Sequence, residues 1–248
     1  MHSCLFSTVV AVSLRNQKVT LPRSTRDIVK VSGGISMPNL NQFTICFEIA
    51  RSAQRDNEII FSVNSAKGYD IAFGKTANGM ALIIDTKECS IDSIISSANF
   101  TSTMKPLCLT WSTHTRELAL QFDGNYRTKV CADLNKGVKF ENLQLGAGDS
   151  GDDDDDEDDI GSFDGFIYNF RLWRNAMTLL ELSSITCDSV GDLVDWDNNF
   201  WDIPSSFAQT DSSLSCSKYI LLLLLLNCIG FCHCHFIVKR HVHFPSYG

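Results

Sequence analysis

Ten cysteines make thiol oxidation the first chemistry that this sequence suggests. That is many for a reducing compartment, where structural disulfides are rare. Six of them lie in the strand-rich part of the chain, and none of the six forms a C-x-x-C pair of the kind that binds zinc. Their spacing therefore predicts disulfides in an extracellular protein; the six are Cys46, Cys89, Cys108, Cys131, Cys187 and Cys216.

Calcium binding is the second chemistry, suggested by eight consecutive acidic residues at 152–159 within an acidic loop insert at 149–159. Calcium takes about six to eight oxygen ligands at defined positions. A contiguous acidic block supplies charge without that geometry, and it usually stays solvated because like charges repel. We therefore expect no required cofactor, and we favour loose calcium association with this block over a tight site.

N-linked glycosylation is the third chemistry that the sequence suggests, because Asn99-Phe100-Thr101 is the one N-x-[ST] acceptor in the chain.

The net charge of −8 comes mostly from the acidic block, and no comparable basic patch is present. Nucleic acid is therefore excluded as an expected partner.

Catalysis is not expected. Glycosidases on related folds need paired acids that alternate with apolar residues on a rigid strand. Asp195 and Asp197 flank Trp196, but no third acid continues that alternation, and His114 has no nucleophile in a recognisable frame. We expect no catalytic residue, and we expect Trp196 and its aromatic neighbours to serve packing.

The elements that position these residues are mostly β-strands. Bulky apolar residues occupy every second position in four segments, which places one face of each on a core. Asp123-Gly124 predicts a tight hairpin, because glycine tolerates positive φ. Frequent turns between short strands indicate an antiparallel two-sheet sandwich or jelly roll. The four segments are 43–49, 107–111, 118–122 and 166–172.

One short helix is expected near residues 178–186. Thr178 and Glu181 form a capping-box pattern, and Leu179, Leu182 and Ile185 follow at helical spacing. We expect this helix to lie on the sandwich and to end near Cys187.

The two ends of the chain leave alternatives open. Residues 1–16 contain an apolar run of signal-peptide length without a basic start, so a leader, an ordinary strand and a truncated start all remain possible interpretations.

Residues 217–248 form an apolar tail. Its segment 219–238 is long enough for a membrane anchor, but it carries polar residues that are costly in lipid. A transmembrane segment and a non-native exon both remain.

Two segments carry a resemblance to the pentraxin family: FTIC at 43–46 and LCLTWS at 107–112. The second resembles the family's H-x-C-x-x-W signature, although Pro106 stands where the histidine is usual. The segment FDGFIYNFRLW at 163–173 resembles a late strand that leads into the family's single helix, and Val194-Asp195-Trp196 resembles the strand after it. The resemblance covers residues 18–216 and implies a jelly-roll sandwich of the pentraxin/laminin-G type.

A narrower resemblance comes from YNFRLW at 168–173, VDWDNNFWDIP at 194–204 and LSC at 214–216. Together these look like the pentraxin-like module of a subfamily G adhesion G-protein-coupled receptor. That resemblance implies an extracellular adhesion module at the cell surface, which binds matrix or cell-surface proteins or glycans. The alternative is a soluble, calcium-dependent pattern-recognition pentraxin that forms a cyclic oligomer.

The resemblance also implies a disulfide between Cys46 and Cys108, and the strand pattern supports it. Each of these cysteines is out of phase with its bulky neighbours, so on adjacent strands both side chains would lie on the same face. We expect Cys187–Cys216 as a second pair that ties the last segment to the end of the helix. Cys89–Cys131 follows only by elimination.

Calcium ligands implied by the resemblance are weakly matched. In pentraxins they lie partly in the loop after the strand that here ends at Gly146, where this chain offers Asp149, Asp152 and Asp153. The other half of the family site aligns near Asp70, the only residue of the right type there.

Overall fold

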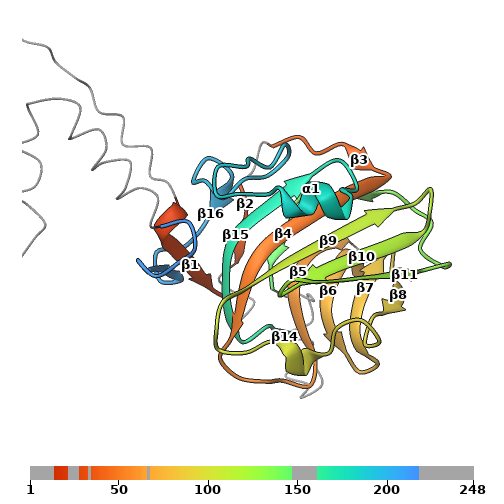
Figure 1. Cartoon of the computed structure of the whole chain (residues 1–248), viewed down its shortest axis with the longest axis horizontal. Helices are drawn as coiled ribbons and strands as arrows, with labels where there is room; N and C mark the ends of the chain where they lie inside the picture. Colours follow the sequence, from red (N-terminus) through yellow and green to blue (C-terminus); the bar gives the residue numbers. More distant parts are fainter. Residues whose placement is uncertain (1–13, 22–27, 33–34, 66–67, 147–160, 218–248) are drawn as a thin grey trace, which may run out of the picture.

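The computed structural model describes residues 14–217, except 22–27, 33–34, 66–67 and 147–160. In this part of the chain, two β-sheets pack face to face and one short α-helix lies outside them (Figure 1). The predicted all-β sandwich is confirmed. The strand pairs are antiparallel except for the short pairing of β14 (Gly161–Ser162) with β5 (Glu58–Ser65).

The first sheet has seven strands and contains all four of the segments predicted from apolar alternation. Its central strands are the two that carry Cys46 and Cys108, paired residue against residue. In order across the sheet, the strands are β11 (Asn125–Val130), β10 (Glu117–Phe122), β9 (Lys105–Ser112), β4 (Gln42–Arg51), β15 (Gly165–Trp173), β1 (Gln17–Thr20) and β17 (Ala208–Thr210).

The second sheet has eight strands and forms the opposite layer, with β14 added beside β5. A separate two-stranded ribbon pairs β12 (Val138–Lys139) with β3 (Asn39–Leu40). The remaining strands of the second sheet, in order, are β16 (Trp201–Asp202), β2 (Val29–Val31), β13 (Gln144–Leu145), β5, β6 (Gly68–Thr76), β7 (Gly79–Ile84) and β8 (Lys87–Ser90).

The core lies between the sheets and is filled by the apolar members of each alternation. Phe47 of β4 stacks on Phe170 of β15 with ring centroids 5.5 Å apart, and Phe61 of β5 meets Phe170 edge-on at 5.7 Å. Aromatic rings thus bridge the two layers. The predicted hairpin joins β10 to β11, where Asp123 and Gly124 both have positive φ, as a type I′ turn requires.

Helix α1 spans Leu179–Ser183 and lies on the outer face of the first sheet (Figure 1). Thr178 and Glu181 form the predicted capping box. The helix ends earlier than predicted, because the Thr186 N–H donates to the Ser189 hydroxyl instead of to the carbonyl oxygen of Leu182, as a longer helix would require. Two 3₁₀ turns are also present, η1 (Leu14–Asn16) and η2 (Ser97–Asn99).

The strand expected at 194–196 is not formed. Val194 makes a single isolated bridge with Leu172, and the chain then turns so that Trp196 is buried and donates its Nε1–H to the carbonyl oxygen of Leu14 at 3.0 Å. The start of the described chain is therefore packed into the domain. Residues 1–13 lie outside the described residues.

The apolar tail predicted as a membrane anchor or a non-native exon also lies outside them, from residue 218 onward. No helix within the described residues is both long and apolar enough to cross a membrane.

Candidate functional site: a groove on the outer face

The strand register brings five side chains into one row across the outer face of the first sheet. Arg171 on β15 pairs with Cys46, which pairs with Cys108, then Gln121 and finally Tyr126 on β11. Directly paired residues in an antiparallel sheet point to the same side. All five therefore face away from the main core, toward α1.

Three disulfides fix this domain, and they join the same pairs that the sequence leads us to expect. Cys46 and Cys108 are bonded across β4 and β9, with Cα atoms 4.1 Å apart. Cys187 and Cys216 are bonded with Cα atoms 5.3 Å apart, which ties the segment after α1 to the last described residues. The third disulfide, Cys89–Cys131, joins the second sheet to the first beyond the edge of the groove.

A half-open groove of about 680 Å³ lies over this row, and we call it the outer groove. Its floor is the Cys46–Cys108 disulfide with neighbouring side chains of β4, β9 and β10. One wall comes from α1 and the loop that follows it, and the other from the segment that ends at Cys216. Leu182 anchors the helix by packing on Cys46 and Trp173.

A β-bulge shapes one end of the outer groove. Tyr168 pairs with Glu48 and Arg171 pairs with Cys46, so β15 has one residue more than β4 between these pairs. Asn169 sits in this bulge with φ of 58°, a left-handed conformation that Asn tolerates better than most residues. Its Nδ2–H donates to the sulfur of Cys216 at 3.6 Å, which links the bulge to the second disulfide.

Arg171 holds the wall of the groove in place. Its Nη1–H and Nη2–H donate to the carbonyl oxygens of Thr186 at 2.8 Å and Cys187 at 3.1 Å. Its Nε lies 3.3 Å from a carboxylate oxygen of Asp195. Burial lowers the pKa of Arg171, and the charge of Asp195 opposes that shift. The positive charge of Arg171 is therefore used within the domain.

Glu48 is the acidic group of the outer groove, and it comes from β4 next to the disulfide floor. Its carboxylate accepts a hydrogen bond from the Ser215 hydroxyl. Burial raises the pKa of Glu48, while the Ser215 hydrogen bond and the charge of Arg171 act in the opposite direction. Tyr168, which also faces Glu48, has its pKa raised to about 12, first by burial and then by the charge of Glu48, so it stays protonated.

The sequence did not single out Glu48, Gln121, Asn169 or Ser215. A usable signal existed for Glu48, because it shares the parity of Cys46 and so had to face outward from β4. The β-bulge at Asn169 and the hydrogen bond from Ser215 to Glu48 have no such signal in the sequence, since both depend on contacts between segments far apart in the chain.

Of the predicted calcium ligands, only Asp70 belongs to the described residues, so the predicted site stays a prediction. Asp70 lies half-buried in β6, and Asp149, Asp152 and Asp153 fall in 147–160, outside the described residues. In the part of the chain that the structure describes, no three His, Cys, Asp or Glu side chains are grouped as metal ligands.

The sequon asparagine is accessible. Asn99 is exposed at the end of η2, where its Oδ1 accepts a hydrogen bond from the Ser96 backbone N–H at 2.8 Å. Its Nδ2, the atom that a glycan would occupy, makes no hydrogen bond to any described residue.

Comparisons with known proteins agree with this architecture. The model of the Pentaxin family matches residues 18–207. The chain is 49% identical over 220 residues to the adhesion G-protein coupled receptor G6 of Danio rerio, covering 86% of this chain and 18% of that protein.

Two solved structures are similar. The full extracellular region of zebrafish Gpr126/Adgrg6 matches with a TM-score of 0.72 and 46% identity, covering 82% of this chain and 27% of that chain. A native heptameric SAP-like pentraxin from Limulus polyphemus matches with a TM-score of 0.59 at 16% identity, over 83% of this chain and 100% of that one, which shows a shared fold alone. The chain thus spans less than a third of the adhesion receptor relatives that it matches. With the family model covering most of its length, the chain belongs to the pentaxin, or pentraxin, family.

Proposed function

We propose that this chain provides an extracellular recognition module, over residues 18–216, of a cell-surface adhesion receptor. The observation that carries the proposal is the 49% identity to an adhesion G-protein coupled receptor, together with a match to the extracellular region of a zebrafish receptor of that kind. Its partners are proteins or glycans of the matrix or of neighbouring cell surfaces. The module binds them through the outer groove.

An extracellular setting is supported by the three disulfides, which persist in oxidising compartments. The accessible Asn99 is the acceptor for an N-linked glycan. Calcium is not required for folding of the module, although the acidic block at 152–159 associates with it loosely.

The outer groove is the best-supported contact surface. Four large apolar side chains are exposed among the described residues, and two of them, Leu179 and Leu180, lie on α1, the helix that supplies one wall of the groove, although neither lines the groove itself. Leu180 is 82% exposed. Apolar side chains gathered beside a groove with a few polar groups are typical of interaction sites.

Binding is favoured over catalysis by how the polar groups are used. Arg171 supports two carbonyl oxygens, and Glu48 accepts from Ser215, so both side chains serve to position the walls. Neither forms a nucleophile–base pair of the kind that acyl or glycosyl transfer needs.

A solid-phase assay on matrix deposited by cultured fibroblasts tests the proposal. Ser183 is exposed on α1 and lines the outer groove, so Ser183→Trp would fill the groove without disturbing the core. Ser184→Trp places the same bulk one residue further along the chain, outside the groove lining, and is the matched control. We expect the chain and the control to bind the matrix and Ser183→Trp to lose most binding. Equal binding by both variants would contradict the role of the groove, and no binding by any would contradict the module's role.

The soluble pentraxin alternative makes different predictions. A cyclic oligomer would have a solution mass of several chains, and millimolar calcium would raise its melting temperature by preferential binding to the folded state. Analytical ultracentrifugation and melting with calcium or a chelator distinguish the two functions.

A further inference from the structure

Glu48 forms no ion pair with a lysine or arginine among the described residues, although the charge of Arg171 acts on it from a distance. Among the described residues, its one hydrogen bond comes from the neutral Ser215 hydroxyl. The guanidinium of Arg171 is itself engaged by Asp195 and two carbonyl oxygens. A partly buried carboxylate in this position is stabilised by a cation that arrives from outside.

Other acceptors line the same groove. Asn169 uses its Nδ2–H on the Cys216 sulfur, which leaves its Oδ1 without a partner among the described residues. Gln121, beside Cys108 in the row across the sheet, makes no side-chain hydrogen bond to any described residue. Carboxylate and amide oxygens are the acceptors that an ammonium group, with three donors and no acceptor, can use.

The remaining lining suits an aliphatic stem. Met104, Leu182 and Ile185 line the outer groove together with the sulfurs of both disulfides. Lysine side chains bury their methylene groups on such surfaces while the charged end reaches polar groups. The planar fork of arginine would instead prefer a bidentate carboxylate, and one Glu48 oxygen is already bonded to Ser215.

We propose that the outer groove takes the side chain of a lysine from a protein partner, with Glu48 as its counterion and Asn169, which contacts the same Ser215–Cys216 segment as Glu48, as a further acceptor. The proposal rests on the proposed function and names the chemistry of the ligand.

The test uses the full chain labelled with ¹³C at its methionine methyl groups. Met104 lines the groove and reports its occupancy, whereas Met80 is buried in the core and reports folding. The probe is a blocked pentapeptide, Gly-Ala-Lys-Ala-Gly, and its control carries norleucine in place of lysine. We expect the lysine peptide to shift the Met104 resonance saturably with a Kd of about millimolar, and the norleucine peptide to leave it unchanged.

Matched variants identify the counterion. Glu48→Gln keeps the shape and the Ser215 hydrogen bond, and it should weaken lysine-peptide binding about tenfold or more through loss of a charged hydrogen bond. Glu141→Gln removes an exposed carboxylate outside the outer groove and should leave the affinity unchanged. Equal affinity for both peptides, equal affinity of the wild type and Glu48→Gln, or no Met104 shift would overturn the inference. If Ser183→Trp still abolishes matrix binding in that case, the proposed function stands without it.

Discussion

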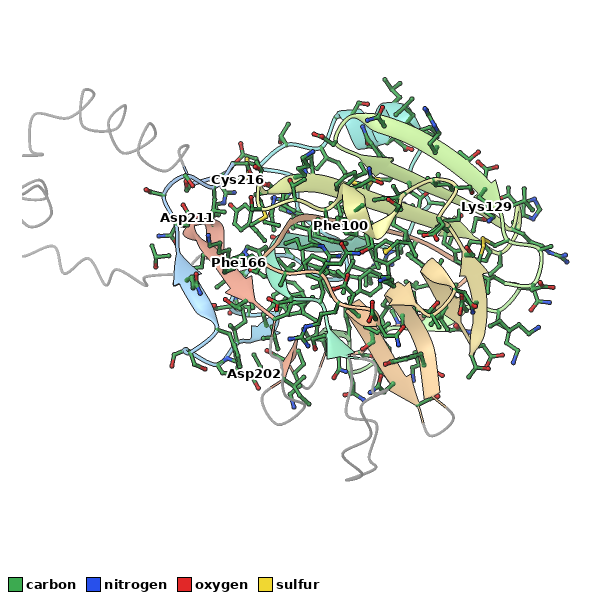
Figure 2. The ribbon with its side chains drawn as sticks, turned by 90° about the horizontal axis from the view of Figure 1, so that it is seen from below. Phe100, Lys129, Phe166, Asp202, Asp211 and Cys216 are labelled. Carbon is green, nitrogen blue, oxygen red and sulfur yellow. A yellow bond between two sulfur atoms is a disulfide. The ribbon has the colours of Figure 1, made fainter. Side chains whose placement is uncertain are left out.

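Removing one disulfide at a time separates stability from recognition. Cys187–Cys216 closes a loop with a sequence separation of 29 and forms a wall of the outer groove, whereas Cys89–Cys131 closes a separation of 42 and does not line it. Figure 2 shows Lys129, two residues before Cys131, at the opposite end of the molecule from Cys216. The two disulfides therefore close loops of similar length, but only Cys187–Cys216 lines the outer groove, so each serves as the control for the other.

The chain-entropy model gives the magnitude. Replacing both cysteines of a pair by serine should cost about 3.6 kcal/mol for the shorter loop and about 4 kcal/mol for the longer one. For a domain of this size, either loss should lower Tm by about 7–16 °C. Scanning calorimetry of the two double-serine variants should show similar decreases.

Binding should respond differently. Without the Cys187–Cys216 bond, the segment that carries Ser215 is released from the bulge at Asn169, and the outer groove loses a wall. We expect this variant to lose matrix and lysine-peptide binding at a temperature where it is still folded, and the Cys89/Cys131 variant to bind within about twofold of the wild type. Equal retention or equal loss of binding in the two variants would refute this account of the groove.

Four further outcomes are expected. Burial raises the pKa of Glu48 above 4.5, so the contribution of this group to stability is complete below that pH and is lost as the pH rises through the folded-state pKa. The Tm of Glu48→Gln relative to that of the wild type should therefore be higher at pH 7 than at pH 4. A difference in Tm that does not change with pH would contradict this. Glu58 is 1% exposed and pairs with buried Arg51, so Glu58→Gln should cost about 3 kcal/mol by chemical denaturation, and a loss below about 1 kcal/mol would contradict an intact buried pair. Asn99→Gln should lower the mass of the secreted chain by one glycan, measured by mass spectrometry, and should leave Tm unchanged. A mass without this decrease would show that the sequon is unused. The Tm measured in millimolar calcium should lie within about 1 °C of the Tm measured in a chelator, whereas a rise of several degrees would reveal a specific calcium site.

Local patterns predict much of the fold. Period-two alternation locates β4, β9, β10 and β15, because a sandwich strand buries one face and exposes the other. The same parity places Cys46 and Cys108 on the outer face, where the register pairs them directly. Thr178 and Glu181 fix the start of α1, since a capping box depends only on neighbouring residues.

The candidate site was much less accessible to such reasoning. The wall that follows α1 depends on Arg171, which reaches carbonyl oxygens of residues 186 and 187. The left-handed bulge at Asn169 breaks the alternation on which strand prediction rests. The outer groove exists because these long-range contacts hold a helix and the Cys216 segment apart over a sheet, and no local pattern encodes that separation.

Hydroxyl-radical footprinting of the chain bound to matrix tests most directly whether recognition occurs at the outer groove. Met104 and Ile185 line the groove and are partly exposed, and Val130, 65% exposed on β11, is outside its lining and serves as the reference. The account predicts that binding reduces oxidation of Met104 and Ile185 and leaves that of Val130 unchanged. Unchanged oxidation of the groove residues, with protection confined to β11 or the second sheet, would contradict it.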